Sequence, residues 1–437
     1  MNRRLSLAVA YALTTMGLIG SSNMAFAITD LETNAAIPFS FSNPGARSLG
    51  MGGAFVGLAD DATAAYTNPA GLTQLVQTEV SVEGRRTETN SPYTSGGSAT
   101  LPYDLSGVTI GNTKNTNTSP SFIALVIPHG DWSFAFYRHE LAKFNTSFAG
   151  AGGTLFPDFV PPQELTPYDA RADLHIVNYS FALALKANEH VSIGVGMSYY
   201  QFDFSAQRNE TLQTASSRNN ADDQGSDHAL AATVGLRLRF NEQWSAGFAY
   251  RVSPKFNYSE HIEGFLPDAS GAYTILDPGN QLTAREQFKV PDVISAGISY
   301  RPSEQLIVNL DVDQVYYSQL TGKLTSNFGI PNATLDRLNI QNGTEVHLGG
   351  EYTFINMDHP LSLRAGIWHD PRHTIALDGA PTNLDDLTDA VAFGGGYGAK
   401  THYSIGAGMA FKQFQIDAAY DGSDKVKTAS ISAVYRF

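Results

Sequence analysis

The sequence predicts an all-β fold, a transmembrane antiparallel β-barrel of about 14 strands with a small N-terminal helical hatch that plugs the lumen. Segments that alternate apolar and polar residues follow one another along most of the chain. Short turns and long polar loops alternate between these segments, and the chain ends on Phe437. Bacterial barrels of one chain have an even number of strands, short periplasmic turns and longer outer loops. Together these features favour a membrane barrel over a soluble sandwich, which would show the same alternation.

The N-terminus has the pattern of a secretory signal peptide. Two arginines are followed by an apolar run and then by Ala25-Phe26-Ala27, a small-residue motif typical of a cleavage site. We therefore expect residues 1–27 to be removed and the mature chain to begin at Ile28. A membrane anchor is the alternative interpretation, but the apolar run is short for a helix that crosses a bilayer.

Composition limits the possible partners and cofactors. The chain has 437 residues and a net charge of −14, which argues against nucleic acid as a partner because binding phosphates requires a basic face. Phe (25), Tyr (20) and Gly (40) are frequent while charged residues make up only 16%, a composition that suits strands and turns. With no cysteine, the chain has neither disulfides nor thiolate metal sites.

Residues 43–75 are rich in Gly and Ala and do not show the period of two that a half-buried strand needs. Two consecutive aspartates precede an alanine-rich run there, which is compatible with a short helix. Pro69 disfavours the helical conformation at the residue before it, so this helix should end near Thr67. We expect residues 28–75 to form the hatch, a compact plug of short helices and turns.

The barrel should occupy residues 76–437. We expect a long polar loop at 84–118 after the first strand, and similar loops after every second strand. The expected strands are 76–83, 121–127, 132–148, 171–186, 191–207, 229–240, 244–259, 285–300, 306–319, 344–355, 361–368, 402–411, 414–420 and 428–437.

The last strand illustrates the two faces that a membrane barrel requires. Ile431, Tyr435 and Phe437 share one face, and Ser430 and Ser432 share the other. A charge on the lipid-facing side of a barrel costs about 2–4 kcal/mol near the bilayer midplane, which accounts for such segregation. We expect the apolar face of each strand to contact lipid and the polar face to line the lumen.

Three motifs in the predicted hatch resemble a known family. Gly50-Met51-Gly52-Gly53-Ala54, Ala59-Asp60-Asp61-Ala62 and Asn68-Pro69-Ala70-Gly71-Leu72 are similar to the N-terminal hatch of the FadL/TodX transporters. The resemblance implies a fourteen-stranded barrel in the outer membrane of a Gram-negative bacterium, which takes up long-chain fatty acids or hydrocarbons as a monomer. It also implies hatch-function roles for Asn68, Pro69 and Ala70, with a simple helix cap and turn as the alternative.

The same resemblance implies a mechanism. Outer loops would capture a hydrophobic small molecule, the lumen would bind it, and a lateral opening at an inward kink of the third strand would release it into outer-membrane lipid. In this chain the corresponding segment, 133–138, contains no Gly or Pro that would mark a kink.

Two groups of residues are candidates for ligand binding. The expected outer loop at 150–162 is unusually apolar and offers a capture surface at Leu155, Phe156, Phe159 and Val160. Arg237 and Arg239 face the predicted lumen, where they can bind a carboxylate head group or pair with lumenal acids such as Asp311 and Asp313.

No feature indicates an enzyme, a cofactor or a metal. The glycine-rich run at 50–57 lacks the strand–helix context of a nucleotide site, and no Gly-x-Ser-x-Gly motif is present. His369, Asp370 and His373 have metal-like spacing, but at a strand–loop junction we expect them to be solvated. The alternative function is a structural or secretion-accessory barrel that binds a protein; a water-filled porin is a third possibility that the hatch argues against.

Overall fold

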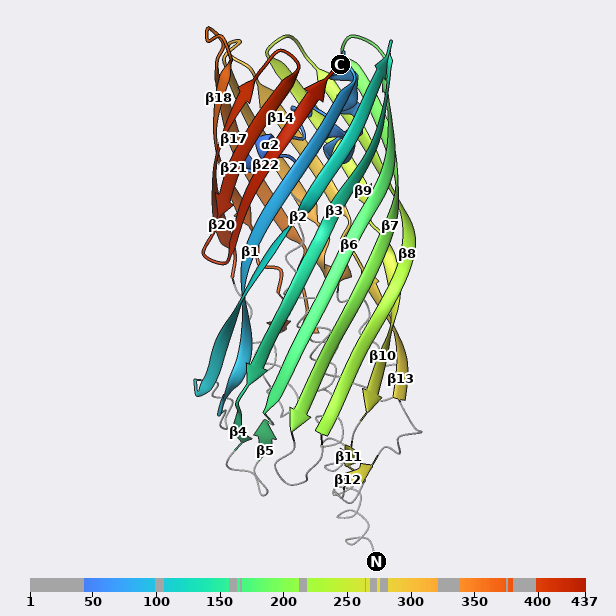
Figure 1. Cartoon of the computed structure of the whole chain (residues 1–437), viewed down its shortest axis with the longest axis vertical. Coiled ribbons are helices and arrows are strands. Elements are labelled where there is room, and N and C mark those ends of the chain that lie inside the picture. Colours follow the sequence, from blue (N-terminus) through green and yellow to red (C-terminus); the bar gives the residue numbers. More distant parts are fainter. Residues whose placement is uncertain are drawn as a thin grey trace, which may run out of the picture.

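Fourteen strands close into an antiparallel barrel in the computed structural model (Figure 1). β1 pairs with β2 on one side and with β22 on the other, so the sheet closes on itself. β9 and β10 succeed each other on one barrel strand, as β13 and β14 do. The structure describes residues 43–98, 106–156, 163–165, 167–211, 218–263, 265–267, 273–275, 282–320, 338–374, 376–379 and 398–437.

The strands that form the barrel wall vary in length. They are β1 (Glu79–Ser98), β2 (Val108–His129), β3 (Trp132–Gly150), β6 (Tyr168–Lys186), β7 (Val191–Thr211), β8 (Arg218–Arg239), β9 (Trp244–Val252) with β10 (Lys255–Glu263), β13 (Leu282–Lys289) with β14 (Val293–Tyr300), β15 (Leu306–Val315), β17 (Gly343–Phe354), β18 (Leu361–Asp370), β20 (Lys400–Ala410), β21 (Phe414–Gly422) and β22 (Val426–Arg436). Smaller elements are β4 (Gly152–Phe156), β5 (Gln163–Leu165), β11 (Phe265–Pro267), β12 (Tyr273–Ile275), η2 (Tyr317–Gln319), β16 (Leu338–Asn339) and β19 (Ala376–Leu377).

The predicted fold class is confirmed, but the expected loop at 84–118 is not. β1 continues to Ser98, β2 begins at Val108, and the two remain paired from Arg85↔Ser119 to Gly97↔Val108. Figure 1 shows this hairpin reaching away from the short-turn end of the barrel. The Thr, Asn and Ser residues of this hairpin lie beyond the apolar band, where a strand does not need an apolar side that faces lipid. Polar composition therefore did not distinguish a loop from a strand in this segment.

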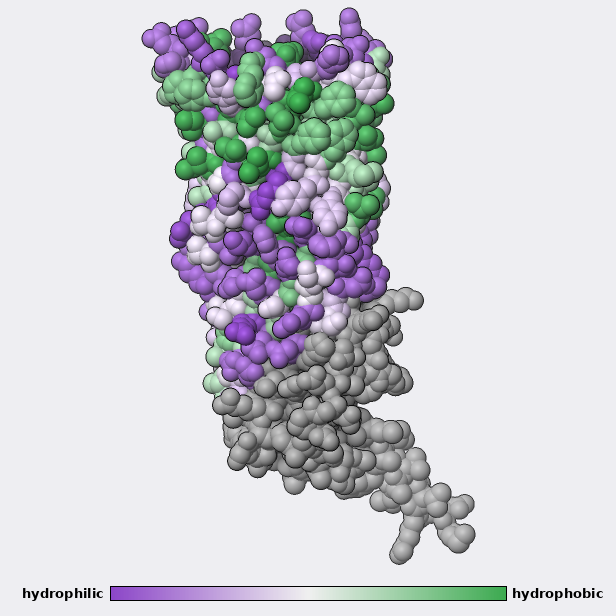
Figure 2. Space-filling view, turned by 45° about the vertical axis from the view of Figure 1, so that its right-hand side comes forward, coloured by the Kyte–Doolittle hydropathy of each residue, from purple (hydrophilic) through white to green (hydrophobic). Residues whose placement is uncertain are grey.

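The outer surface of the barrel carries an apolar band next to its short-turn end. Figure 2 shows this band in green, with a hydrophilic surface beyond it. The outward Ile431 of β22 and Phe437, the residue that follows this strand, are 64% and 66% exposed, whereas Ser430 and Ser432 are buried, as predicted. An apolar band of this kind is the lipid-facing surface of a membrane barrel. Among the described residues no helix has the length and hydropathy needed to span a bilayer.

Residues 43–75 lie inside the barrel, near the same end. They form α2 (Ala46–Gly50), α3 (Ala64–Thr67), the 3-10 helix η1 (Pro69–Gln74) and tight turns. α3 ends at Thr67, as predicted, because Asn68 adopts an extended conformation before Pro69. We call residues 43–75 the hatch segment below. The expected signal peptide and the first residues of the expected hatch lie outside the described residues.

Glycines of the barrel wall receive the backbone of the hatch segment. At six of these wall glycines, an added Cβ atom would lie less than 3.0 Å from atoms of the hatch segment. At Gly297 it would also lie less than 3.0 Å from the Asp311 carboxylate. The six glycines form three cross-strand pairs: Gly194 with Gly235, Gly247 with Gly297, and Gly349 with Gly366. Glycine weakens a strand interior and marks a close approach of another backbone. The three pairs therefore form a seat for the hatch segment, although glycine at these positions lowers the stability of the strands.

We expect Gly194→Ala to unseat the hatch, because the new methyl group would collide with the backbone of Pro69 and Ala70. Gly196→Ala is the matched control, since it lies on the same face of β7 and its nearest neighbour would be 3.7 Å away. Overpacking of this kind costs about 1–3 kcal/mol. Ion conductance in planar bilayers should rise in Gly194→Ala alone, and equal conductance in both variants would contradict the seat.

Candidate ligand pathway through the barrel

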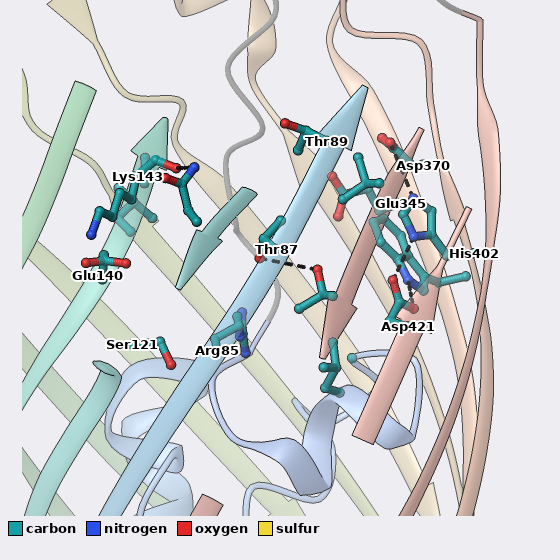
Figure 3. Close-up of a pocket in the computed structure, with 18 of the residues that line it drawn as sticks. Arg85, Thr87, Thr89, Ser121, Glu140, Lys143, Glu345, Asp370, His402 and Asp421 are labelled. Carbon is teal, nitrogen blue, oxygen red and sulfur yellow. Dashed lines mark hydrogen bonds and ion pairs between the residues drawn. The ribbon is translucent and has the colours of Figure 1, made fainter. Parts of the chain in front are cut away.

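A cavity of about 130 Å³ lies in the lumen, directly against the hatch segment. Leu49, Gly52 and Gly53 of the hatch contribute to its lining. Figure 3 shows side chains of β1 between two groups, one on β2 and β3 and the other on the wall that contains Asp370 and His402. The cavity therefore extends from the hatch to two different parts of the barrel wall.

The wall beside the cavity has a gap in its main-chain hydrogen bonding between β2 and β3. These strands pair from His129↔Trp132 to Phe122↔His139 and no further. Beyond that point β2 continues to pair with β1, and β3 with β6. We call this unpaired stretch the seam.

Side chains, rather than a strand ladder, bridge the seam. The Asn117 amide donates to the Lys143 carbonyl oxygen at 3.1 Å, and the Ser119 hydroxyl donates to the Glu140 carboxylate. The Glu140 carboxylate also contacts His175 Nε2 at 2.9 Å. Such contacts can break without disrupting either strand's pairing on its other edge, so the seam is a weak line in the wall.

A bulge in β3 marks the start of the seam. The pairing of β3 with β6 shifts register between Glu140 and Ala142, which leaves Leu141 as an additional residue. Leu141 is buried and lines the cavity. Segment 133–138 is regular, as the absence of Gly and Pro indicated, and the irregularity comes later. The bulge is visible as a change in the alternation of inward and outward residues along β3. Outward residues are even-numbered before the bulge and odd-numbered from Lys143 onward.

An apolar cluster lies in the lumen on the β3 side, beside the mostly polar residues of β2 and β3 that line the cavity. Phe202 stacks on Phe256 and Phe288, with ring centroids 4.7 and 5.6 Å apart. These rings belong to one buried cluster that extends to Leu141 and Phe144 of β3. The buried apolar cluster thus extends through the lumen as far as the start of the seam.

The opposite wall of the cavity is charged. Asp370 accepts from the Lys400 ammonium at 3.2 Å and lies 3.1 Å from His373 Nδ1, while Asp421 lies 2.7 Å from His402 Nδ1. The expectation that Asp370 and His373 are solvated was wrong, because the end of β18 turns them into the lumen. Burial alone would lower the pKa of His373, but its bond to Asp370 holds that pKa above its ordinary value.

Asn68 joins the hatch segment to the wall. Its amide nitrogen donates to the carbonyl oxygens of Val56, at 3.2 Å, and of Leu236 in β8, at 3.0 Å. Its Oδ1 accepts from the Ala70 amide at 3.3 Å, which caps η1. Asn68 is fully buried, and Pro69 begins η1. The side chain thus connects two turns of the hatch segment and one barrel strand.

Charged groups hold the hatch segment on another side. Arg47 of α2 contacts Asp60 at 2.6 Å and Glu351 of β17 at 2.9 Å. Glu351 in turn binds Arg364 of β18 at 2.6 Å. Burial alone would lower the pKa of Arg47, but the Asp60 and Glu351 carboxylates outweigh it and hold that pKa above its ordinary value.

The two predicted lumenal arginines do not belong to the cavity. Arg237 and Arg239 lie two and four residues nearer the short turn than Gly235, the glycine on which Asn68 rests. Neither forms an ion pair within the described part of the chain. The expected pairing with Asp311 and Asp313 was wrong, since Asp311 accepts from hatch amides and Asp313 lies near a histidine.

The predicted capture loop is only partly within the described residues. Leu155 and Phe156 lie in β4, which pairs with β5 and with the end of β1. Phe159 and Val160 lie outside the described residues. Their role in ligand capture stays a prediction.

This architecture is shared with a known protein family. A family profile described as outer membrane protein transport protein (OMPP1/FadL/TodX) matches residues 33–433. Outer membrane protein P1 of Haemophilus influenzae is 23% identical over 356 residues, which cover 74% of each protein.

Solved structures share the fold at low identity. A Pseudomonas aeruginosa FadL homologue has a TM-score of 0.64 at 14% identity, over 91% of this chain and 99% of its own. The Pseudomonas putida toluene transporter TodX has a TM-score of 0.55 at 14% identity, over 91% and 98%. The toluene transporter TbuX of Ralstonia pickettii has a TM-score of 0.56 at 14% identity, over 91% and 99%. With the profile spanning most of the sequence and the barrel closed, this chain belongs to the FadL/TodX family of outer-membrane transport proteins, which are channels and not enzymes.

Proposed function

We propose that this protein takes up hydrophobic compounds, such as long-chain fatty acids or hydrocarbons, by passive diffusion and lateral release as a monomer. The observation that carries the proposal is the lumenal cavity that reaches the seam between β2 and β3. An apolar molecule that leaves through the seam passes into lipid without crossing water, which avoids a cost of about 25 cal/mol per Å² of apolar surface.

The proposed path begins at the outer loops and ends in the membrane. Leu155, Phe156, Phe159 and Val160 are candidates for capture. The ligand then passes beside the aromatic cluster around Phe202 to Leu141, and the seam opens when the side-chain bonds that cross it, among them those of Thr113, Asn117 and Ser119, break. The outward residues beside the start of the seam, Ile123 and Tyr179, are 42% and 50% exposed. The proposed exit at the seam therefore lies at the margin of the apolar band that is farther from the short turns.

The size of the cavity bears on the substrate. Its 130 Å³ is close to the roughly 150 Å³ of an engineered apolar cavity that holds benzene in another protein. A compact aromatic compound therefore fits as the lumen stands. A long acyl chain extends beyond the cavity, toward the seam or the outer loops.

Ligand binding tests the proposal directly. Purified protein should bind labelled toluene or a labelled long-chain fatty acid saturably, and mass spectrometry should find an apolar molecule retained from the membrane. Thr87→Trp should weaken binding at least tenfold, or about 1.4 kcal/mol, because Thr87 lines the cavity. Arg86→Trp, on the opposite face of β1, is the control. Absence of binding by the folded protein would favour the protein-partner alternative.

Lateral release predicts that closing the seam blocks transport but not capture. The chain has no cysteine, so Asn117→Cys with Ala142→Cys introduces one pair across the lumenal side of the seam, to be bridged by a short bis-methanethiosulfonate reagent. Uptake by cells should fall at least tenfold after cross-linking while ligand binding persists. Thr87→Cys with Asn117→Cys joins β1 to β2, which are already paired, and should leave uptake intact. Equal uptake after both cross-links would exclude release through the seam.

Asn68→Asp separates a hatch role from a helix cap. Aspartate keeps the oxygen that accepts from Ala70 but cannot donate to the Val56 and Leu236 carbonyl oxygens. Two buried acceptors then lose their donor, at about 1–3 kcal/mol each. Uptake should fall while the barrel remains folded by circular dichroism. If Asn68→Asp transports normally and Asn68→Ala does not, Asn68 is only a cap.

A further inference from the structure

Four ionisable side chains meet on the inner face of β15 and β17, where the wall touches the hatch segment. Asp313 and Glu345 are cross-strand partners, and so are Asp311 and His347. Residues two apart on a strand point to the same face, so all four turn toward the lumen. Glu345 and His347 are only 5% and 2% exposed. Carboxylates directly opposite each other destabilise a sheet, so this group requires a compensating positive charge.

Asp311 already has partners and is not part of the remaining cluster. Its Oδ2 accepts from the amides of Phe55 and Val56, at 2.5 and 2.6 Å. Each of the other three residues offers one nitrogen or oxygen atom, and these atoms all lie within 4.8 Å of one another. They form a three-donor group of one imidazole and two carboxylates.

The imidazole of His347 has the orientation of a metal ligand. Its Nδ1 lies 2.6 Å from the Gly52 carbonyl oxygen. A carbonyl oxygen can only accept, so Nδ1 carries a proton; when the ring is neutral, Nε2 presents a lone pair to an ion. Nε2 is buried and has no hydrogen-bond partner. Metal-binding histidines are usually oriented in this way, through a bond from the other ring nitrogen.

The separations between the donor atoms match coordination better than hydrogen bonding. His347 Nε2 lies 3.4 Å from Glu345 Oε2 and 3.6 Å from Asp313 Oδ2. Tetrahedral bonds of about 2.0–2.2 Å place ligand atoms about 3.4 Å apart. A charged imidazole would instead approach one carboxylate to about 2.7–2.9 Å. Asp313 Oδ1 is likewise buried without a partner, and the Tyr317 hydroxyl steadies Glu345 at 2.7 Å.

We propose that Asp313, Glu345 and His347 bind a divalent transition-metal ion of the Zn²⁺ class, which fastens the hatch segment to the barrel wall. Imidazole favours Zn²⁺-class ions over Mg²⁺ and Ca²⁺, and three protein ligands leave a fourth position for water. Glu345, Gly52 and Gly53 line the cavity, so the ion has an entry path from the lumen. The ion orients His347, and His347 holds the Gly52 carbonyl.

Metal binding by the purified full-length protein tests this proposal. After chelation and dialysis, the wild type should take up one Zn²⁺ per chain, measured by calorimetry and elemental analysis. Asp313→Asn should weaken binding at least tenfold, and it leaves the hydrogen bond of His347 to Gly52 in place. Co²⁺ in place of Zn²⁺ should give the visible absorption of a tetrahedral site. Zn²⁺ should also slow hydrogen exchange at the amides of residues 52–56 in the wild type and not in Asp313→Asn.

His402→Gln is the matched control, because His402 is also buried beside two carboxylates, Asp370 and Asp421. It should bind Zn²⁺ as the wild type does. His347→Ala should lose the ion, although it also removes a contact to the hatch. The proposal is overturned if the stripped wild type takes up no Zn²⁺, or if Asp313→Asn binds it equally well. It is also overturned if His402→Gln weakens binding as much as Asp313→Asn.

Discussion

The structure depends on how a polypeptide backbone can fill the lumen of a barrel. Every buried amide and carbonyl of the hatch segment needs a partner, and its short helices satisfy few of these groups themselves. The wall supplies the others, through Asn309 and Asp311 of β15 and His347 of β17. Side chains as short as these reach the hatch only if the two backbones come close. The paired wall glycines make that approach possible.

This seat is not the same all round the barrel. From β8 through β9 to β22 the contacts include many directional hydrogen bonds and ion pairs, such as Arg251 to the Tyr66 carbonyl oxygen at 3.0 Å. On the side of β2, β3 and β6 the hatch offers alanines and Leu72 to an apolar surface that includes Phe122 and Ala135. The unpaired seam between β2 and β3 lies next to this second side. The wall that is weakest in main-chain pairing therefore faces the part of the hatch that, among the described residues, contacts the wall mainly through apolar side chains.

Much of this fold could be predicted because its determinants are local. Alternation along single strands established the faces, and the Asn68-Pro69 pair established where α3 ends. The features that were missed depend on closure of the barrel. Asp313 and Glu345 are 32 positions apart and meet only because β15 and β17 pair in one register. The bulge at Leu141 has no Gly or Pro to announce it, and only a change in parity along β3 reveals it.

The asymmetry of the seat limits how the hatch can yield to a ligand. A hydrogen bond to a charged group contributes about 1.5–3 kcal/mol, so release of the Asp311 and Glu351 contacts together is unfavourable for a small apolar molecule. Apolar contacts are non-directional and roughly proportional to buried area. A ligand that enters beside Leu141 replaces part of that contact area with its own. The hatch is therefore expected to move most readily on its β3 side, which is the side of the proposed exit.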